Sequence, residues 1–327
     1  MKKYLVTGGS GFIGSEIVKK LVNSGNKVRV FDNNSRGNIR RLSSVLDKIE
    51  FIEGDIRNLQ QVIDSTKDID SVLHLAYLNG TEYFYSKPDL VLDIGIRGML
   101  NILDACRIHK VQEFILASSS EVYQSAPIIP TPENVPLVIP DILNPRFSYG
   151  GGKLASELLA LQYANTFIEK VIVFRPHNVF GPDMGWEHVI PQLSMKIIES
   201  IEKNPFHDTI ELEIQGNGLE TRSFIFIEEF TQALDLILKK GESRQIYHIG
   251  TQNEISISEL AIEIARLLGK TLQFKYTPLL SGSTLRRCPD IKKLKSLGFN
   301  PILSIREGLE KVIPWYRDNR HLMVKLK

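Results

Sequence analysis

The chain has 327 residues, of which 43% are hydrophobic and 24% are charged, a balance typical of a soluble globular protein. Its 40 basic and 38 acidic residues leave a net charge of +2 without any basic block, so nucleic acid is not an expected partner. No apolar run reaches membrane-spanning length, so no membrane partner is expected either. Cys106 and Cys288 are the only two cysteines and lie far apart, which argues against a disulfide framework and fits a reducing, cytoplasmic location.

The first half of the chain alternates short apolar runs, which indicate buried strands, with helical patterns. The expected strands are residues 4–6, 28–31, 49–52, 71–75, 113–117 and 171–174, and the expected helices include 12–24, 90–109 and 153–167. This alternation predicts an α/β fold in which a parallel sheet is covered on both faces.

The second half is less regular. Six of the 15 prolines fall within residues 127–145, which predicts a long loop that ends just before Tyr149. Beyond residue 182, the patterns predict helices and strands that form a smaller α/β lobe over the carboxyl edge of the sheet. The expected helices are 189–203, 228–240 and 256–268, and the expected strands are 210–214 and 245–250.

A glycine-rich turn follows the first strand and opens the first helix. Gly8, Gly11 and Gly14 are spaced as in a dinucleotide-binding turn, with Phe12 and Ile13 between them. Glycines there permit a tight turn, close approach of the backbone to a pyrophosphate, and close helix–strand packing. Because helix N-terminal amides face the phosphates, these residues are predicted to bind a dinucleotide cofactor.

Acidic residues after the next two strands indicate which cofactor is bound. Asp32 ends the second strand, where a carboxylate accepts hydrogen bonds from the adenosine ribose and repels a 2′-phosphate, so NAD is favoured over NADP. Arg36 lies nearby and keeps NADP open, because an arginine can hold that phosphate. Asp55 and Ile56 follow the third strand, and the Asp55 carboxylate is placed to reach the adenine amino group.

Together with later motifs, these residues resemble the extended short-chain dehydrogenase/reductase family, which includes nucleotide-sugar epimerases, 4,6-dehydratases and decarboxylases. The resemblance covers nearly the whole chain and rests on the glycine turn, Asp32 and residues 54–56, 74–76, 118–123, 149–153, 175–182, 221–225 and 287–291. It implies a Rossmann-like, doubly wound NAD-binding domain over residues 1–175, with Leu75 and Ala76 at the cofactor. Residues 176–327 are expected to form mainly a nucleotide-sugar-binding lobe, with some segments returning to the main domain.

The resemblance further implies a nucleotide-diphosphate sugar as substrate and a homodimer formed through helices 90–109 and 153–167. Two positions depart from the family pattern. Gly95 stands where the family often has asparagine, three residues before Gly98. Residues 280–283 replace a common Arg-x-Gly-Asp, so Arg222, Arg286 or Arg287 is expected to supply the missing contact.

The resemblance assigns proton transfer to Tyr149 and Lys153, with Ser119 beside them. Tyrosine has a reference pKa of about 10 and is a poor base at neutral pH. Lys153 lies four residues later, so on a helix it shares a face with Tyr149, and its ammonium, together with the positive nicotinamide ring, favours the phenolate. Tyr149 would take the proton of a sugar hydroxyl, Ser119 would hydrogen-bond the same oxygen, and Lys153 would also hold the nicotinamide ribose.

The residues after Ser119 bear on the reaction type. Most family members oxidise C4 of the sugar, and Glu121 is placed to remove the acidified C5 proton, as in 4,6-dehydratases. The Ser120-Glu121 pair is similar to GDP-mannose 4,6-dehydratases and also to UDP-glucuronate decarboxylases, for which Arg287 fits a further motif. The favoured function is a nucleotide-sugar 4,6-dehydratase. A 4-epimerase, a decarboxylase, a net C4 dehydrogenase or reductase, and a non-catalytic NAD-binding regulatory protein remain alternatives.

The remaining site residues are assigned to the substrate. The expected substrate-binding residues are Lys87, Ser120, Asn178, Arg222 and Arg287. Arg222 is expected at the diphosphate, where a charge-assisted hydrogen bond is strong. No metal is expected, because His177 and His188 have no ligand-spaced partner.

Overall fold

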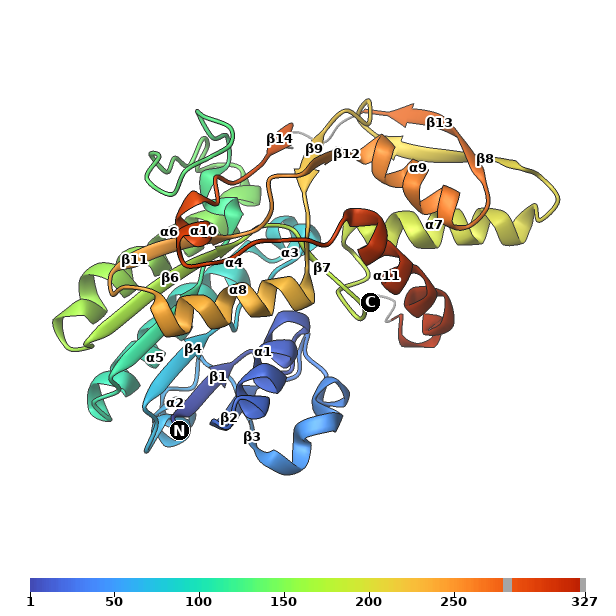
Figure 1. Ribbon diagram of the computed structural model, residues 1–327. Helices are drawn as coiled ribbons and strands as arrows, with labels where there is room; N and C mark the ends of the chain where they lie inside the picture. The colour runs from blue at the N-terminus through green and yellow to red at the C-terminus, as the bar shows by residue number, and fades with distance from the viewer. Residues whose placement is uncertain (279–283, 324–327) are drawn as a thin grey trace.

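The computed structural model describes residues 1–278 and 284–323. Its centre is a seven-stranded parallel sheet with the strand order β11-β6-β5-β4-β1-β2-β3 (Figure 1). The strands are β1 (Lys3–Thr7), β2 (Lys27–Asp32), β3 (Ile49–Glu53), β4 (Ser71–His74), β5 (Glu113–Ala117), β6 (Lys170–Pro176) and β11 (Gln245–Ile249). The predicted α/β fold with a doubly wound sheet is confirmed.

Two hydrophobic cores cover the two faces of this sheet. Neighbouring residues of β1 divide between them, Val6 packing in one core and Leu5 in the other, because successive strand side chains point to opposite faces. Helices α1 (Phe12–Asn23) and α8 (Ile227–Lys240) pack together on one face, and α2 (Leu59–Thr66) and α5 (Gly98–Ile108) on the other. This double cover explains why the central strands are almost continuously apolar.

The order of the strands determines where a ligand can bind. From β1 the chain proceeds outward through β2 and β3, then returns to the other side of β1 with β4, β5 and β6. The switch lies between β1 and β4, and in sheets of this kind ligands bind in the crevice outside the carboxyl ends of the strands at that point. The glycine turn follows β1 and therefore lies at the switch.

The two long predicted helices are each interrupted. Residues 88–108 form α4 (Pro88–Leu92), a π-helical turn (Asp93–Arg97) and then α5. The second helix begins earlier than predicted, because α6 (Ser148–Leu158) follows a 3₁₀ turn (Pro145–Phe147) whose N-cap, Asn144, accepts a hydrogen bond from the Arg146 amide. Tyr149 therefore lies inside the helix and not before it, despite three glycines that are weak helix formers.

A smaller lobe lies beyond one end of the sheet (Figure 1). It contains α7 (Val189–Lys203), α9 (Ile257–Leu267), α11 (Ile305–Asp318) and a parallel pair of strands, β8 (Thr209–Gln215) and β13 (Thr271–Thr277). Strands β9 (Thr221–Ser223), β12 (Glu254–Ser256) and β14 (Arg286–Arg287) form a second small sheet. Strand β11 lies in the central sheet although it follows residue 176, and the domain boundary at residue 175 stays a prediction.

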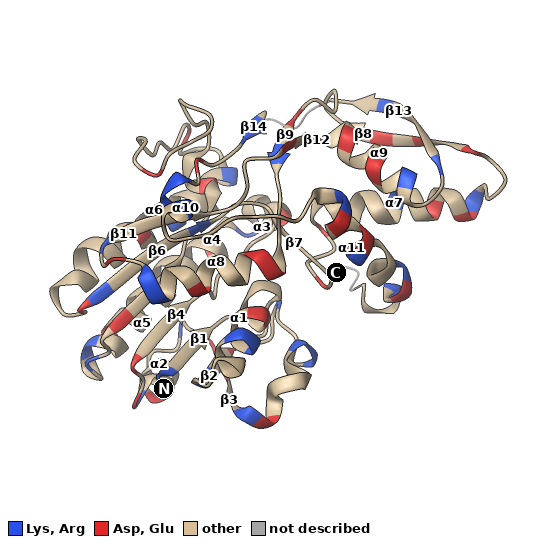
Figure 2. Ribbon diagram, in the orientation of Figure 1, with Lys and Arg blue, Asp and Glu red and all other residues tan. Residues whose placement is uncertain are grey.

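The remaining helices and strands with these labels are short. They are α3 (Thr81–Ser86), β7 (Val179–Phe180), β10 (Ile225–Phe226) and α10 (Lys292–Ser296), which packs against β11. Acidic and basic residues are interspersed over the helices of both parts in the view of Figure 2. Within residues 1–278 and 284–323, no helix combines the length and apolarity that a membrane span requires.

Candidate functional site

The glycine turn brings three stretches of backbone into unusually close contact. Gly8 has φ +70°, and a Cβ added to it would lie 2.7 Å from the amide nitrogen of Ala76. A Cβ on Gly14 would lie 2.2 Å from the carbonyl oxygen of Gly8. Only glycine fits at these two positions, and α1 then begins directly at the turn with its free amides facing the crevice. This cradle fits the pyrophosphate of a dinucleotide.

Asp32 is buried at the end of β2 and is held by backbone amides. Its two carboxylate oxygens accept hydrogen bonds from the Ser10 and Asn34 amides, each at 2.9 Å. Asp55 lies beyond β3 and forms an ion pair with Arg57 at 2.7 Å, and the hydrogen bond from Arg57 lowers the pKa of its carboxyl. Both carboxylates line the crevice, where Asp32 is fixed in place to accept further hydrogen bonds from a ribose.

One cavity of about 470 Å³ extends from the glycine turn to the end of β5, within the size range of small-molecule sites. It brings together most of the predicted residues. Those that line it are Gly8, Gly11, Phe12, Ile13, Gly14, Asp32, Asp55, Ile56, Leu75, Ala76, Ser119, Ser120, Glu121, Tyr149, Lys153, Asn178 and Arg287. Lys87 and Arg222 are the two predicted site residues that do not.

Lys153 and Tyr149, the residues predicted to transfer the proton, are buried where β5 meets α6. Lys153 Nζ donates a hydrogen bond to the Ala117 carbonyl at 2.7 Å and lies 6.0 Å from the centre of the Tyr149 ring. Burial lowers the pKa of Lys153 to about 7. Burial also raises the pKa of Tyr149, against the opposing effect of a hydrogen bond with Ser119. The polypeptide alone therefore keeps Tyr149 protonated, and a bound cation is needed to favour the phenolate.

Glu121 forms an ion pair inside the same cavity. Its carboxylate accepts a hydrogen bond from Arg287 Nη1 at 2.6 Å, although the two residues are far apart in the sequence. Burial raises the pKa of Glu121, but the guanidinium of Arg287, with smaller contributions from Arg146 and Arg222, outweighs burial and lowers it. The carboxylate is thus held ionised beside Ser119 and Tyr149.

The predicted substrate residues divide into two groups. Ser120 is buried at the cavity, and Asn178 donates to the Ser223 carbonyl at 2.9 Å while lining the cavity. Lys87 is exposed at the N-terminus of α4, and its Nζ lies 5.9 Å from the centre of the Tyr83 ring. Arg222 is directed to backbone carbonyls, including that of Thr284 at 2.7 Å.

The three arginines expected to replace the missing motif differ in their contacts. Arg286 pairs with Glu254 at 2.6 Å on the surface, whereas Arg287 reaches the cavity. Burial and the nearby charge of Arg287 lower the pKa of Arg222 to about 10. Residues 280–283 lie outside the described residues. Arg287 is therefore the arginine of this set that is available to a ligand in the cavity.

Sequence reasoning did not identify several other residues at the site. Tyr77 packs edge-on against Tyr149 with ring centres 5.1 Å apart, and Phe84 stacks on Tyr149 at 4.8 Å. Arg36 forms an ion pair with Glu187 at the cavity. The sequence keeps Arg36 open as a contact for a 2′-phosphate, whereas in the structure its guanidinium is paired with Glu187. The aromatic residues at 77, 83 and 84 after β4 were the available signal, because a loop there faces the crevice.

Behind the cavity lies a buried ion pair between α6 and β6. Arg175 donates from Nε and Nη2 to the two carboxylate oxygens of Glu157, at 2.8 and 2.6 Å. Ser118 donates to the same carboxylate at 2.5 Å, and Arg175 also contacts the Tyr123 hydroxyl. Through its hydrogen bond with Ser118, the pair fixes the backbone at the end of β5, directly before Ser119. Its sequence signal is Glu157, four residues beyond Lys153 on the same helix.

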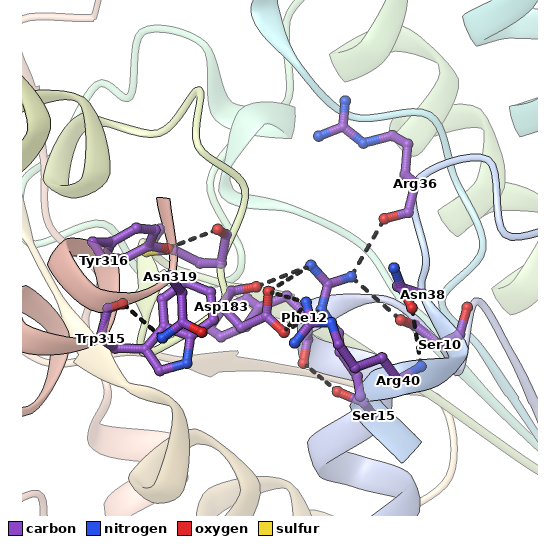
Figure 3. A network of polar contacts seen from close by, with 12 residues as sticks. Ser10, Phe12, Ser15, Arg36, Asn38, Arg40, Asp183, Trp315, Tyr316 and Asn319 are labelled. Atoms are coloured by element: carbon purple, nitrogen blue, oxygen red, sulfur yellow. Dashed lines mark hydrogen bonds and ion pairs between the residues drawn. The ribbon is translucent and has the colours of Figure 1, made fainter. Parts of the chain in front are cut away.

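Asp183 connects the glycine turn with the smaller lobe (Figure 3). Its carboxylate pairs with Arg40 at 2.9 Å and with Arg41 at 3.1 Å, and Arg41 also donates to the carbonyl of Ser10 in the glycine turn. In α11, the buried hydroxyl of Tyr316 donates a hydrogen bond of 2.7 Å to the carbonyl of Met184, the residue that follows Asp183. The network thus holds the glycine turn and the lobe in a fixed relation.

Metal ligands do not gather in the part of the chain that the structure describes, where no group of three His, Cys, Asp or Glu side chains could hold an ion. His177 is buried, and burial lowers its pKa well below the usual value. His188 lines the cavity beside Glu187, and burial lowers its pKa too. Both rings are therefore neutral near pH 7.

Comparisons with known proteins agree with this geometry. The NAD dependent epimerase/dehydratase family matches residues 4–250. A dTDP-glucose 4,6-dehydratase of Streptomyces niveus is 29% identical over 99% of this chain and 96% of its own length. A putative UDP-glucose 4-epimerase of Methanocaldococcus jannaschii is 30% identical over 96% of this chain and 98% of its own.

Among solved structures, DesIV of Streptomyces venezuelae, a dTDP-glucose 4,6-dehydratase with NAD and TYD bound, is similar with a TM-score of 0.87. It is 26% identical and covers 99% of this chain and 100% of its own. The glycine cradle and Asp32 fit the cofactor seen there. The chain therefore belongs to the NAD dependent epimerase/dehydratase family, and it is an NAD-dependent enzyme.

Proposed function

We propose that the protein is a nucleotide-sugar 4,6-dehydratase. The observation that carries the proposal is the Glu121 carboxylate, which lines the same cavity as Ser119, Tyr149 and Lys153. A carboxylate at this place supplies the base that elimination requires and simple hydroxyl oxidation does not. The dTDP-glucose 4,6-dehydratases among the relatives, which match nearly the full length of the chain, support the same reaction.

The first step is oxidation at C4 of the sugar. NAD, which Gly8, Gly14 and Asp32 would hold, would supply the acceptor for the C4 hydride and the donor of the same hydride to C6. Tyr149 takes the proton of the C4 hydroxyl, and Ser119 holds the same oxygen by a hydrogen bond. The positive charge of the oxidised cofactor and the Lys153 ammonium offset the burial that raises the Tyr149 pKa. Tyr149 is thereby a base only while the cofactor is bound and oxidised.

The second step is loss of water. The C4 ketone acidifies the C5 proton, which the Glu121 carboxylate removes. The C5–H electron pair forms the C5–C6 double bond, and the C6 hydroxyl leaves as water with the proton that Glu121 has taken. Hydride then adds to C6 and a solvent proton adds to C5. Because the ion pair with Arg287 holds the Glu121 pKa low, the carboxylate has to leave Arg287 before it acts as a base.

Binding of the nucleotide sugar is assigned to cavity residues outside the glycine turn. Asn178 and Ser120 meet sugar hydroxyls or phosphate, and Arg287, once released, is free to pair with the diphosphate.

We also propose a homodimer through α4–α5 and α6, where Leu92, Leu100 and Leu158 are exposed. We further propose a cytoplasmic location, consistent with two free, buried cysteines.

A panel of nucleotide sugars tests the reaction. The NAD-loaded protein is incubated in heavy water with dTDP-glucose, UDP-glucose, GDP-mannose and UDP-glucuronate, and products are read by mass spectrometry. Loss of the mass of one water, with deuterium at C5, is the expected result for one of them. Loss of carbon dioxide would replace the proposal by decarboxylation, and loss of two hydrogens with reduced cofactor by net oxidation.

C4 epimerisation is the second candidate, and one observation favours it. Glu121 is neutralised by Arg287, and an epimerase needs no free carboxylate there. The putative UDP-glucose 4-epimerase, which is 30% identical to this chain, supports this reaction. Unchanged mass with a new chromatographic position, and no deuterium at C5, would establish it. No change in any sugar despite bound NAD would favour a non-catalytic protein.

A further inference from the structure

Tyr77 packs against both of the predicted proton-transfer residues, Lys153 and Tyr149. It follows β4 at the carboxyl edge of the sheet, and Lys153 Nζ lies 4.1 Å from the centre of its ring. Its ring also meets that of Tyr149 edge-on, with centres 5.1 Å apart. Lys153 Nζ is closer to the Tyr77 ring than to the Tyr149 ring, which is 6.0 Å away. The Tyr77 ring is therefore in contact with both residues and is the aromatic ring nearer to the lysine.

Two glycines make the space that this ring occupies. A Cβ added to Gly95, in the π-helical turn before α5, would lie 2.1 Å from the Tyr77 hydroxyl oxygen. A Cβ added to Gly152, on α6, would also lie 2.1 Å from it. Any side chain at either position would displace the ring from Lys153.

The hydroxyl group itself has no hydrogen-bond partner within the described part of the chain, although it is buried. A buried hydroxyl without a partner costs free energy, so hydrogen bonding does not account for the presence of Tyr77. The contacts of the ring account for the presence of Tyr77. The negative face of an aromatic ring attracts an ammonium within about 6 Å, more strongly where water is excluded.

The ammonium of Lys153 needs such support. Burial lowers its pKa to about 7, and the Glu157 carboxylate on the same helix opposes that shift only in part. His74 faces Lys153 from β4. Around Tyr149 lie Ser119 and Glu121 after β5, together with Arg287 and Arg36.

We propose that Tyr77 is a positioning residue of the proton-transfer site, whose ring, seated against Gly95 and Gly152, holds the Lys153 ammonium beside Tyr149. The assignment rests on the proposed function only in taking Tyr149 as the base for the sugar hydroxyl. Tyr77 itself touches neither the reacting atoms nor the moving proton.

The first test measures ionisation of Tyr149 without any substrate. The NAD-loaded enzyme is titrated with base and followed by phenolate absorbance, and the same titration of Tyr149→Phe is subtracted to isolate this tyrosine. Tyr77→Leu, which removes the ring, is expected to lower the Tyr149 phenolate fraction at a given pH about tenfold, the scale of a desolvated cation–π contact. The conservative Tyr77→Phe is expected to restore it.

The second test moves the ring without removing it. Gly152→Ala places a methyl group 2.1 Å from the Tyr77 hydroxyl, whereas the next ring atom is 3.4 Å away, an ordinary contact. Gly152→Ala alone is therefore expected to lower the phenolate fraction, and Tyr77→Phe/Gly152→Ala is expected to recover it. This pair keeps the test decisive even where Tyr77→Leu fails to fold, which NAD content and thermal unfolding reveal.

Equal titrations for Tyr77→Leu and wild type, or a Gly152→Ala effect that persists in the Tyr77→Phe background, would overturn the proposal. The readout is independent of the sugar. If the panel of nucleotide sugars shows no dehydration while Tyr77→Leu still shifts the titration, the proposed function fails and the positioning role stands. If dehydration occurs and the titration does not respond, the positioning role fails alone.

Discussion

The buried ion pair behind the site predicts a large loss of stability from a nearly isosteric change. Glu157→Gln keeps the shape of the side chain but leaves the Arg175 guanidinium, which is 1% exposed, without a counter-charge. Removing one partner of a buried pair costs about 3–5 kcal/mol. For a chain of 327 residues, the average unfolding entropy per residue converts about 4 kcal/mol into a fall in Tm of about 6 °C.

Calorimetry at pH 7 measures this change. The matched control is Glu228→Gln, which removes a carboxylate from a 3.4 Å pair with Lys311 in which both side chains are about half exposed. An exposed pair contributes at most about 1 kcal/mol, so the control is expected to unfold within about 1–2 °C of wild type. Equal Tm values for Glu157→Gln and Glu228→Gln would refute the argument that Arg175 depends on its buried partner.

Three further predictions concern the site. Gly8→Ala puts a side chain at φ +70° and 2.7 Å from the Ala76 amide, so the protein is expected to purify without NAD, and a normal cofactor content would contradict the cradle. Tyr149→Phe is expected to lower kcat about 10³-fold while bound NAD is retained, as measured by turnover and by cofactor absorbance. Arg287→Gln removes the cation that lowers the Glu121 pKa. The acid limb of the pH profile of kcat/KM is therefore expected to move to higher pH. An unmoved limb would show that Glu121 does not titrate in the reaction.

The central sheet could be predicted from the sequence because its strands are buried on both faces. Their apolar runs, such as residues 113–117, are continuous and bounded by helical patterns. The glycine turn was equally predictable, because close backbone approach restricts Gly8 and Gly14 to one residue type. The start of α6 was misplaced, because three consecutive glycines conceal a helix that capping at Asn144 and packing stabilise.

The parts that could not be predicted depend on contacts distant in the sequence. Arg287 was noted as a motif, but spacing alone cannot show that its guanidinium reaches Glu121. The aromatic residues after β4 point to the crevice, but they do not reveal the role of Tyr77, because its place depends on Gly95 and Gly152 in two other elements. Strand β13 alternates Leu272 and Phe274 with polar residues, a pattern that indicates a strand, yet only its pairing with β8 places it in the fold.

Dehydration depends on removal of the C5 proton by Glu121, and the variant Glu121→Gln tests this step. Glu121→Gln in its NAD-loaded form is mixed in heavy water with the nucleotide sugar that the wild-type enzyme dehydrates. Cofactor reduction is followed by absorbance and C5 deuterium by mass spectrometry. We expect C4 oxidation to persist, whereas deuterium incorporation and water loss fall at least about 10²-fold. Deuterium incorporation at the wild-type rate would contradict it and assign the C5 proton to another group.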